Sequence, residues 1–184
     1  MNDAPRLAID AMGGDVGIEV MLAGAALAQS RAPALLFDLV GDSVAIDAAL
    51  NAHHALRSAS TIVHADDVIS GSDKASQAIR RAKTTSMGIA IDAVKQGRAG
   101  AAVSAGNTGA LMAMSKLALR TMPGIDRPAL AALLPSFGKT DYVMLDLGAN
   151  TECETRNLVE FAVMGAVYAR IVLSLEKPRV SLLN

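Results

Sequence analysis

Residues 100–120 read GAAVSAGNTGALMAMSKLALR: a short apolar run, a glycine-containing turn and a longer run of helical period. We predict a strand over residues 100–104 and an amphipathic helix over residues 108–120, ended by Pro123 and Gly124. Short apolar runs and longer helical runs alternate in the same way along the rest of the chain. This alternation is typical of parallel strands covered by helices, so the sequence predicts an α/β fold.

The order of the predicted elements specifies the fold further. Strands are predicted at residues 6–10, 35–40, 61–65, 100–104, 129–134, 141–146 and 179–183. Helices are predicted at residues 18–30, 43–54, 74–83, 86–96, 108–120 and 157–175. The strands at 129–134 and 141–146 are close enough in sequence to form a hairpin, which makes one pair antiparallel. We therefore expect a three-layer α/β/α, Rossmann-like fold with a mostly parallel, mixed sheet. Because no repeat or linker interrupts the chain, we expect a single domain over residues 1–184.

The charge balance excludes several classes of function. The chain has 184 residues and carries 17 Lys and Arg against 18 Asp and Glu without a basic run, so nucleic acid is not an expected partner. No run of about 18 uninterrupted apolar residues predicts a membrane-spanning helix. The first ten residues lack the pattern of a signal peptide, so a cytoplasmic protein is expected. One cysteine and three histidines offer no zinc-binding spacing, and no metal site is predicted.

The turn at residues 104–109, Ser-Ala-Gly-Asn-Thr-Gly, is suited to holding an anion. It joins a predicted strand to a predicted helix, and the first N–H groups of a helix have no intrahelical partner and carry about half a positive charge. Gly106 and Gly109 allow close approach of the backbone, while Asn107 and Thr108 add side-chain donors. The alternative is an ordinary turn in which Asn107 or Thr108 only caps the helix.

A second glycine-containing loop, Asp10-Ala11-Met12-Gly13-Gly14-Asp15, also follows a predicted strand. It lacks the dinucleotide-binding pattern G-x-G-x-x-G, and the charge of Asp15 would oppose a pyrophosphate. A carboxylate here favours recognition of a hydroxyl, an amide or a cation. A purely structural turn is the alternative.

A third loop, residues 146–150 (Asp-Leu-Gly-Ala-Asn), again follows a predicted strand. Loops at the carboxyl ends of strands line the crevice where open α/β sheets bind ligands, so all three loops are predicted to share one crevice. Cys153 follows Glu152, whose charge is expected to raise the pKa of the thiol, so an inert cysteine is predicted.

Together these loops resemble the bacterial phosphate acyltransferases of phospholipid synthesis over essentially the whole chain. The matching segments, in order, are AIDAMGGD (8–15), LVGD (39–42), VSAGNTGALMA (103–113), GIDRPALAALLP (124–135), MLDLGAN (144–150) and FAVMGAVYAR (161–170). The resemblance implies a fold like phosphotransacetylase and the isopropylmalate dehydrogenase group. Members of the family continue beyond this sequence for nearly the same length again. We therefore expect residues 1–184 to be the N-terminal portion of such a chain, which folds but has little activity alone.

The resemblance also implies a reaction and its partners. Members of the family transfer a fatty acyl group from acyl carrier protein to inorganic phosphate without a cofactor, act as homodimers and associate peripherally with membranes. The candidate catalytic residues are Asn107 and Asp15. Candidate residues for binding phosphate or substrate are Asp10, Gly13, Gly14, Ser104, Gly106, Thr108, Gly109, Arg127, Gly148 and Asn150.

Two other classes of function stay open from the residues alone. One is a non-catalytic domain that holds a phosphorylated or carboxylated ligand in the same crevice, because a fold does not by itself make an enzyme. The other is an NAD-dependent dehydrogenase of related fold, which the missing glycine pattern disfavours.

Overall fold

The computed structural model describes residues 4–138, 141–150 and 152–183. The chain divides into two compact units, Met1–Arg120 and Thr121–Asn184. The single domain expected over residues 1–184 stays a prediction.

The first unit is built on a four-stranded parallel sheet with the order β3-β2-β1-β4. Its strands are β1 (Arg6–Asp10), β2 (Leu36–Gly41), β3 (Ser60–His64) and β4 (Ala101–Val103). β1 pairs with β2 on one side and with β4 on the other. The chain adds strands outward on one side of β1, then crosses back and adds β4 on the other side. The chain therefore reverses its strand order between β1 and β4. The carboxyl ends of these two strands form the topological switch point, where open α/β sheets bind ligands.

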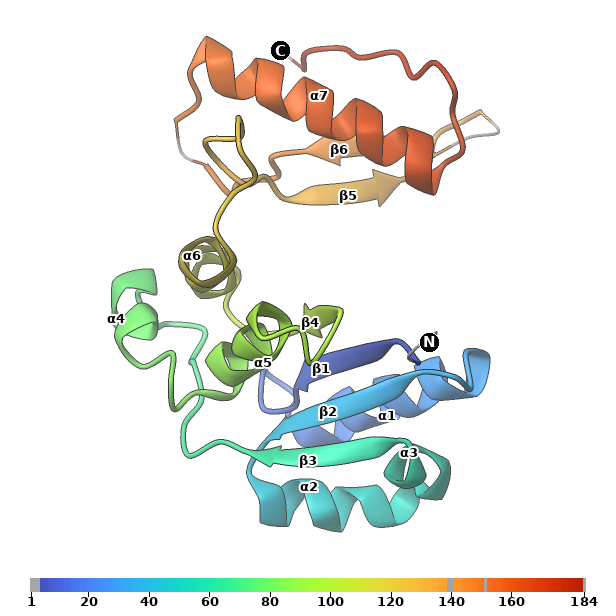
Figure 1. The fold of residues 1–184 in the computed structure, drawn as a ribbon, viewed down its shortest axis with the longest axis vertical. Helices are drawn as coiled ribbons and strands as arrows, with labels where there is room; N and C mark the ends of the chain where they lie inside the picture. The colour runs from blue at the N-terminus through green and yellow to red at the C-terminus, as the bar shows by residue number, and fades with distance from the viewer. Residues whose placement is uncertain (1–3, 139–140, 151, 184) are drawn as a thin grey trace. The chain divides into compact units, whose positions relative to one another are not determined.

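Helices cover both faces of this sheet, as Figure 1 shows. The helices are α1 (Ile18–Arg31), α2 (Ser43–Ala49), η1 (Leu50–Ala52), α3 (His54–Ser58), α4 (Ala75–Arg80), α5 (Ser86–Lys95) and α6 (Thr108–Leu119). Side chains of successive strand residues point to opposite faces, so Ile9 packs with α1, α2 and α3 while Ala8 packs with α5. A third cluster joins α4, α5 and α6 around Met87 and Met114. The α/β class, the mostly parallel sheet and the flanking helix layers are confirmed.

Local signals account for several boundaries. The Asp42 carboxylate accepts hydrogen bonds from the N–H groups of Val44 and Ala45, so Asp42 caps α2. Gly97, which follows the end of α5, has φ of +71°, a conformation that a glycine adopts without strain.

The second unit contains an antiparallel pair and one long helix. Its elements are β5 (Ala131–Leu134), β6 (Tyr142–Leu145) and α7 (Thr155–Val172). The predicted pairing of β5 with β6 is confirmed, but they form a two-stranded sheet of their own and do not join the parallel sheet into one mixed sheet. Within their connection, residues 139–140 lie outside the described part of the chain. Among the described residues, no helix combines the length and apolar character needed to cross a membrane.

The strand predicted at residues 179–183 is wrong. This segment has no strand pairing in the described structure, and Val180, Leu182 and Leu183 are exposed. A strand forms only where a neighbour takes up its backbone N–H and C=O groups, and an apolar run cannot supply that neighbour.

Candidate functional site

The loops that follow β1 and β4 pack against each other at the switch point of the sheet. A Cβ atom added to Gly106 would lie 3.6 Å from the Cα atom of Gly13, and one added to Gly14 would lie 3.2 Å from the Cβ atom of Ala105. Gly14 also has φ of +96°. The distance at Gly106 is an ordinary van der Waals contact, whereas a side chain at Gly14 would press on Ala105 and would be strained by the positive φ.

A partly buried chain of hydrogen bonds joins the same two loops. The Ser104 hydroxyl donates to Oδ2 of Asp10 at 2.7 Å, and the backbone N–H of Gly106 donates to Oγ of Ser104 at 3.1 Å. Asp10 is only 1% exposed, and its other oxygen, Oδ1, is buried without a hydrogen-bond partner among the described residues. Asp10 and Ser104 therefore hold the loops together, and the N–H of Gly106 is directed inward to Ser104.

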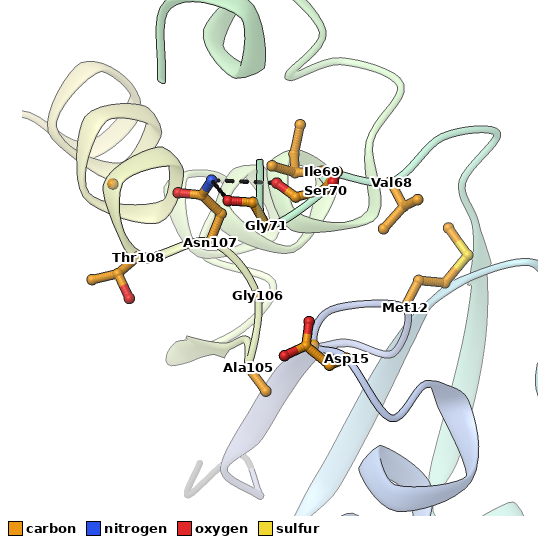
Figure 2. Close-up of a pocket in the computed structure, with 12 residues that line it drawn as sticks. Met12, Asp15, Val68, Ile69, Ser70, Gly71, Ala105, Gly106, Asn107 and Thr108 are labelled. Atoms are coloured by element: carbon orange, nitrogen blue, oxygen red, sulfur yellow. Dashed lines mark hydrogen bonds between the residues drawn. The ribbon is translucent and has the colours of Figure 1, made fainter. Parts of the chain in front are cut away.

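Above these loops lies an open pocket of about 580 Å³. Three segments line it: Met12, Gly14 and Asp15 after β1, residues 68–71 after β3, and residues 105–109 after β4. Figure 2 shows the Asp15 carboxylate on the side of the β1 loop, facing the segment that leads into α6. Asp15 is exposed and makes no hydrogen bond to any described residue, so its oxygens are available to a ligand.

The N-terminus of α6 opens into this pocket through Thr108 and Gly109, whose N–H groups are in the first turn and lack intrahelical partners. Asn107 caps the helix, since its Oδ1 accepts from the N–H of Ala110 at 2.9 Å. Its side-chain NH₂ group donates to the carbonyl oxygens of Ser70, Gly71 and Asp73, at 3.3, 3.1 and 2.9 Å. Figure 2 shows this side chain directed at the 68–71 segment. The structure thus uses both ends of the Asn107 amide internally.

The sequence analysis missed the wall formed by residues 68–71. Arg81 holds this segment: Nε donates to Oδ2 of Asp67 at 2.7 Å, Nη2 donates to the Val68 carbonyl at 2.9 Å, and Nη1 donates to Oδ2 of Asp73 at 3.1 Å. The hydrogen bond from Arg81 lowers the pKa of Asp67, and the same pairing raises the pKa of Arg81. Two aspartates flanking a polar loop and an arginine in the next predicted helix were visible in the sequence. Arg81 lies 14 residues after Asp67 and 8 residues after Asp73, and neither spacing by itself indicates a contact.

Arg127, Gly148 and Asn150 belong to the second unit and form a cluster of their own. The Asn150 side chain donates to the Pro128 carbonyl at 3.0 Å and to Oδ1 of Asp146 at 2.9 Å. Arg127 donates to the Glu152 carbonyl at 2.8 Å. Gly148 has φ of +86°, which suits a glycine in this tight loop. Two of the three predicted loops thus line the pocket of the first unit, and a crevice shared by all three stays a prediction.

Cys153 has a raised pKa, as predicted, but Glu152 is not the cause. Partial desolvation raises the pKa of the thiol, as do its hydrogen bond to Oδ2 of Asp146 and the negative charge of that carboxylate. The thiolate is the reactive form, so this exposed cysteine is a poor nucleophile at neutral pH. Among the residues that the structure describes, no group of three or more His, Cys, Asp and Glu side chains is arranged to hold a metal ion.

We expect Cys153→Ser to leave the unfolding midpoint and any turnover unchanged, because the serine hydroxyl retains a donor to Asp146. Alkylation of Cys153 by iodoacetamide at pH 7 should be slower than that of a free cysteine, which timed mass spectrometry measures. Alkylation faster than that of the free amino acid would contradict the assignment of an inert thiol.

Comparison with solved structures places the fold in a known class. The chain is similar to EutD phosphotransacetylase from Staphylococcus aureus, with a TM-score of 0.61 and 18% sequence identity, over 90% of this chain and 52% of that chain. The expected likeness to phosphotransacetylase is confirmed at the level of the fold. A family model described as "Fatty acid synthesis protein" matches residues 5–184, and the chain belongs to this family.

Curated relatives give the match more detail. The chain is 65% identical over 180 residues to a protein named phosphate acyltransferase from Erythrobacter litoralis, covering 98% of this chain and 51% of that protein. It is 54% identical to the phosphate acyltransferase of Bradyrhizobium diazoefficiens, covering 97% of this chain and 51% of the relative. For the Rhodospirillum rubrum phosphate acyltransferase the identity is 49%, covering 100% of this chain and 52% of the relative. The chain therefore spans about half the length of these relatives.

Proposed function

We propose that this chain supplies the phosphate-handling part of an enzyme that transfers a fatty acyl group from acyl carrier protein to inorganic phosphate, giving an acyl phosphate for phospholipid synthesis. The observation that carries the proposal is the pocket at the switch point, which is lined both by the first residues of α6, Thr108 and Gly109, and by Asp15, whose carboxylate makes no hydrogen bond to a described residue. The names of the relatives support it, since both are named phosphate acyltransferase, and that name describes transfer of an acyl group with phosphate as acceptor.

The proposed reaction needs no covalent intermediate on the protein. A phosphate oxygen attacks the thioester carbonyl carbon, the C–O bond forms, the C–S bond breaks, and the thiol of the carrier leaves as a thiolate. A thiol with a pKa of about 8.5 is a good leaving group at neutral pH and needs no strong general acid. Catalysis then rests on orientation and on stabilising the oxyanion, which suits a pocket rich in backbone donors.

The residues of the pocket take distinct roles in this proposal. The backbone N–H groups of Thr108 and Gly109, with the Thr108 hydroxyl, hold phosphate or the oxyanion. Asp15 accepts a hydrogen bond from the protonated phosphate oxygen and takes up its proton as the oxygen attacks. Asp10, Ser104 and the glycines of both loops set the geometry. We further propose that Arg127, Gly148 and Asn150 contact phosphate or the carrier.

The proposal extends to the partners and the setting. Acyl carrier protein is the acyl donor, the complete enzyme is a homodimer in the cytoplasm, and any peripheral membrane contact is made outside residues 1–184.

The test is formation of acyl phosphate from acyl carrier protein thioester and phosphate, trapped with hydroxylamine as the hydroxamate. It is run on residues 1–184 and on residues 1–184 joined to the part of the Erythrobacter litoralis relative that they do not span. We expect phosphate-dependent hydroxamate from the joined chain. Phosphate binding without hydroxamate from the joined chain would favour a binding domain, and reduction of added NAD at 340 nm would favour a dehydrogenase.

In the joined chain, Asp15→Asn is expected to lower the rate of acyl phosphate formation by about 100-fold or more, which is the contribution typical of a general base. The unfolding midpoint should stay unchanged, because Asp15 makes no hydrogen bond to a described residue. Glu19→Gln is the matched control: it removes one negative charge from the first turn of α1, close in sequence but outside the pocket lining. Equal rates for Asp15→Asn and Glu19→Gln would remove Asp15 from the chemistry.

A further inference from the structure

One wall of the pocket is held in part by Arg81, a residue that does not line the pocket. Residues 68–71 form the wall, and the Ile69 side chain is buried in the cluster around Met87 and Met114. The Arg81 guanidinium pairs with both carboxylate oxygens of Asp67 at the start of the segment and with Asp73 at its end. A planar guanidinium that binds at both ends of a short segment restricts the separation of those ends.

The Asp73 residue that pairs with Arg81 also makes hydrogen bonds within the segment, back to Ser70. Oδ2 of Asp73 accepts the N–H of Ser70 at 2.9 Å, and the Ser70 carbonyl accepts the N–H of Asp73 at 3.1 Å. The carbonyl groups of Ser70, Gly71 and Asp73 consequently turn toward one point, which the Asn107 NH₂ group occupies. Arg81 thus shapes the segment, and Asn107 attaches the shaped segment to the N-terminus of α6.

We propose that Arg81 is a positioning residue for the pocket and that the Asn107 side chain acts with it, both through residues 67–73. The wall that they hold lies beside the N–H groups of Thr108 and Gly109, so its position sets how closely those donors surround an anion and how much water reaches them. This inference rests on the proposed function only in taking phosphate as the anion.

The variants separate this role from simple stability. Arg81→Met removes the guanidinium and retains an apolar side chain. Arg81→Lys keeps the positive charge but lacks the planar set of N–H donors that binds two carboxylates at once. Asn107→Ser keeps a cap for α6, since serine and asparagine are comparable caps, but removes the NH₂ group that contacts the segment. Arg57→Met is the matched control: Arg57 makes a similar set of contacts, to Asp47 and Asn51, that lie outside the pocket lining.

Two readouts are measured on residues 1–184: amide hydrogen exchange of residues 68–73, and affinity for inorganic phosphate by equilibrium dialysis. Arg81→Met and Asn107→Ser should each speed exchange in 68–73 and weaken phosphate binding by about 3- to 30-fold, the range for mutations that act through intervening contacts. Arg81→Lys should fall between Arg81→Met and the unchanged chain. The double variant should lose little more than either single one, because both act on one segment. Millimolar guanidinium ion should restore part of the affinity of Arg81→Met, and Arg57→Met should change neither readout.

The outcomes separate this inference from the proposed function. Unchanged exchange of 68–73 in Arg81→Met would overturn the role of Arg81, as would faster exchange with unchanged phosphate affinity. Fully additive losses in the double variant would overturn the joint action of Arg81 and Asn107. Absence of phosphate binding by the unchanged chain would overturn the proposed function instead, and the exchange data would still decide whether Arg81 holds the segment.

Discussion

Replacing Gly88 by alanine is expected to destabilise the protein by about 1–3 kcal/mol or more, the range for overpacking a filled interior. Gly88 is buried in α5, and an added Cβ atom would lie 1.9 Å from the carbonyl oxygen of Ala82. The next nearest atoms, at 2.6 and 2.8 Å, are also backbone atoms of Ala82, so no side-chain rotation relieves the overlap. Helix propensity alone predicts the opposite sign, since alanine is favoured over glycine in a helix by about 1 kcal/mol. Urea unfolding followed by circular dichroism measures the change.

Gly24→Ala provides the control for this prediction. Gly24 also lies inside a helix, α1, but among the described residues no atom outside its own stretch of helix lies within 4 Å of an added Cβ. Alanine should therefore stabilise the protein there by about 0.5–1 kcal/mol. If Gly88→Ala stabilised the protein as Gly24→Ala does, the close packing of α5 on residue 82 would be wrong.

Replacing Gly13 by alanine is expected to disrupt the pocket. An added Cβ atom would lie 2.5 Å from Oδ2 of Asp10 and 2.9 Å from Oγ of Ser104, the two atoms whose hydrogen bond joins the loops. The pair would have to separate, which displaces the loop after β4 and the start of α6. Because displacements near 1 Å reduce catalysis by about 100-fold, we expect a loss of that size in the acyl phosphate assay on the joined chain.

Gly100→Ala is the control for Gly13→Ala. Gly100 precedes β4, at the end of the strand away from Ser104. At Gly100, an added Cβ would meet the Arg6 carbonyl oxygen at an ordinary contact distance of 3.7 Å, and no other described atom beyond the neighbouring residues lies within 4 Å. Gly100→Ala should therefore leave the rate unchanged. A Gly13→Ala variant that keeps the full rate and folds normally would show that the bond between Asp10 and Ser104 does not position the site.

Local patterns in the sequence account for most of the first unit. Apolar runs placed β1 and β2 within a residue or two of their observed bounds, because strands buried on both faces need continuous apolar sequence. Glycines after β1 and β4 marked the loops that meet at the switch point, because close approach of two backbones excludes side chains. The same reasoning failed at residues 179–183, where an apolar run has no neighbouring strand.

Contacts between distant residues were decided by the tertiary structure alone. Nothing local indicates that Ser104 meets Asp10 across 94 residues, or that the Asn107 side chain points at Ser70, 37 residues away. The residue types that favour turns and the spacing of apolar residues are properties of residues close together in the chain, so they can be identified from the sequence alone. The partner of a buried polar group depends on which segments the sheet order brings together, so the hydrogen bond between Asp10 and Ser104 and the hold of Arg81 on the pocket wall exist only in the folded protein.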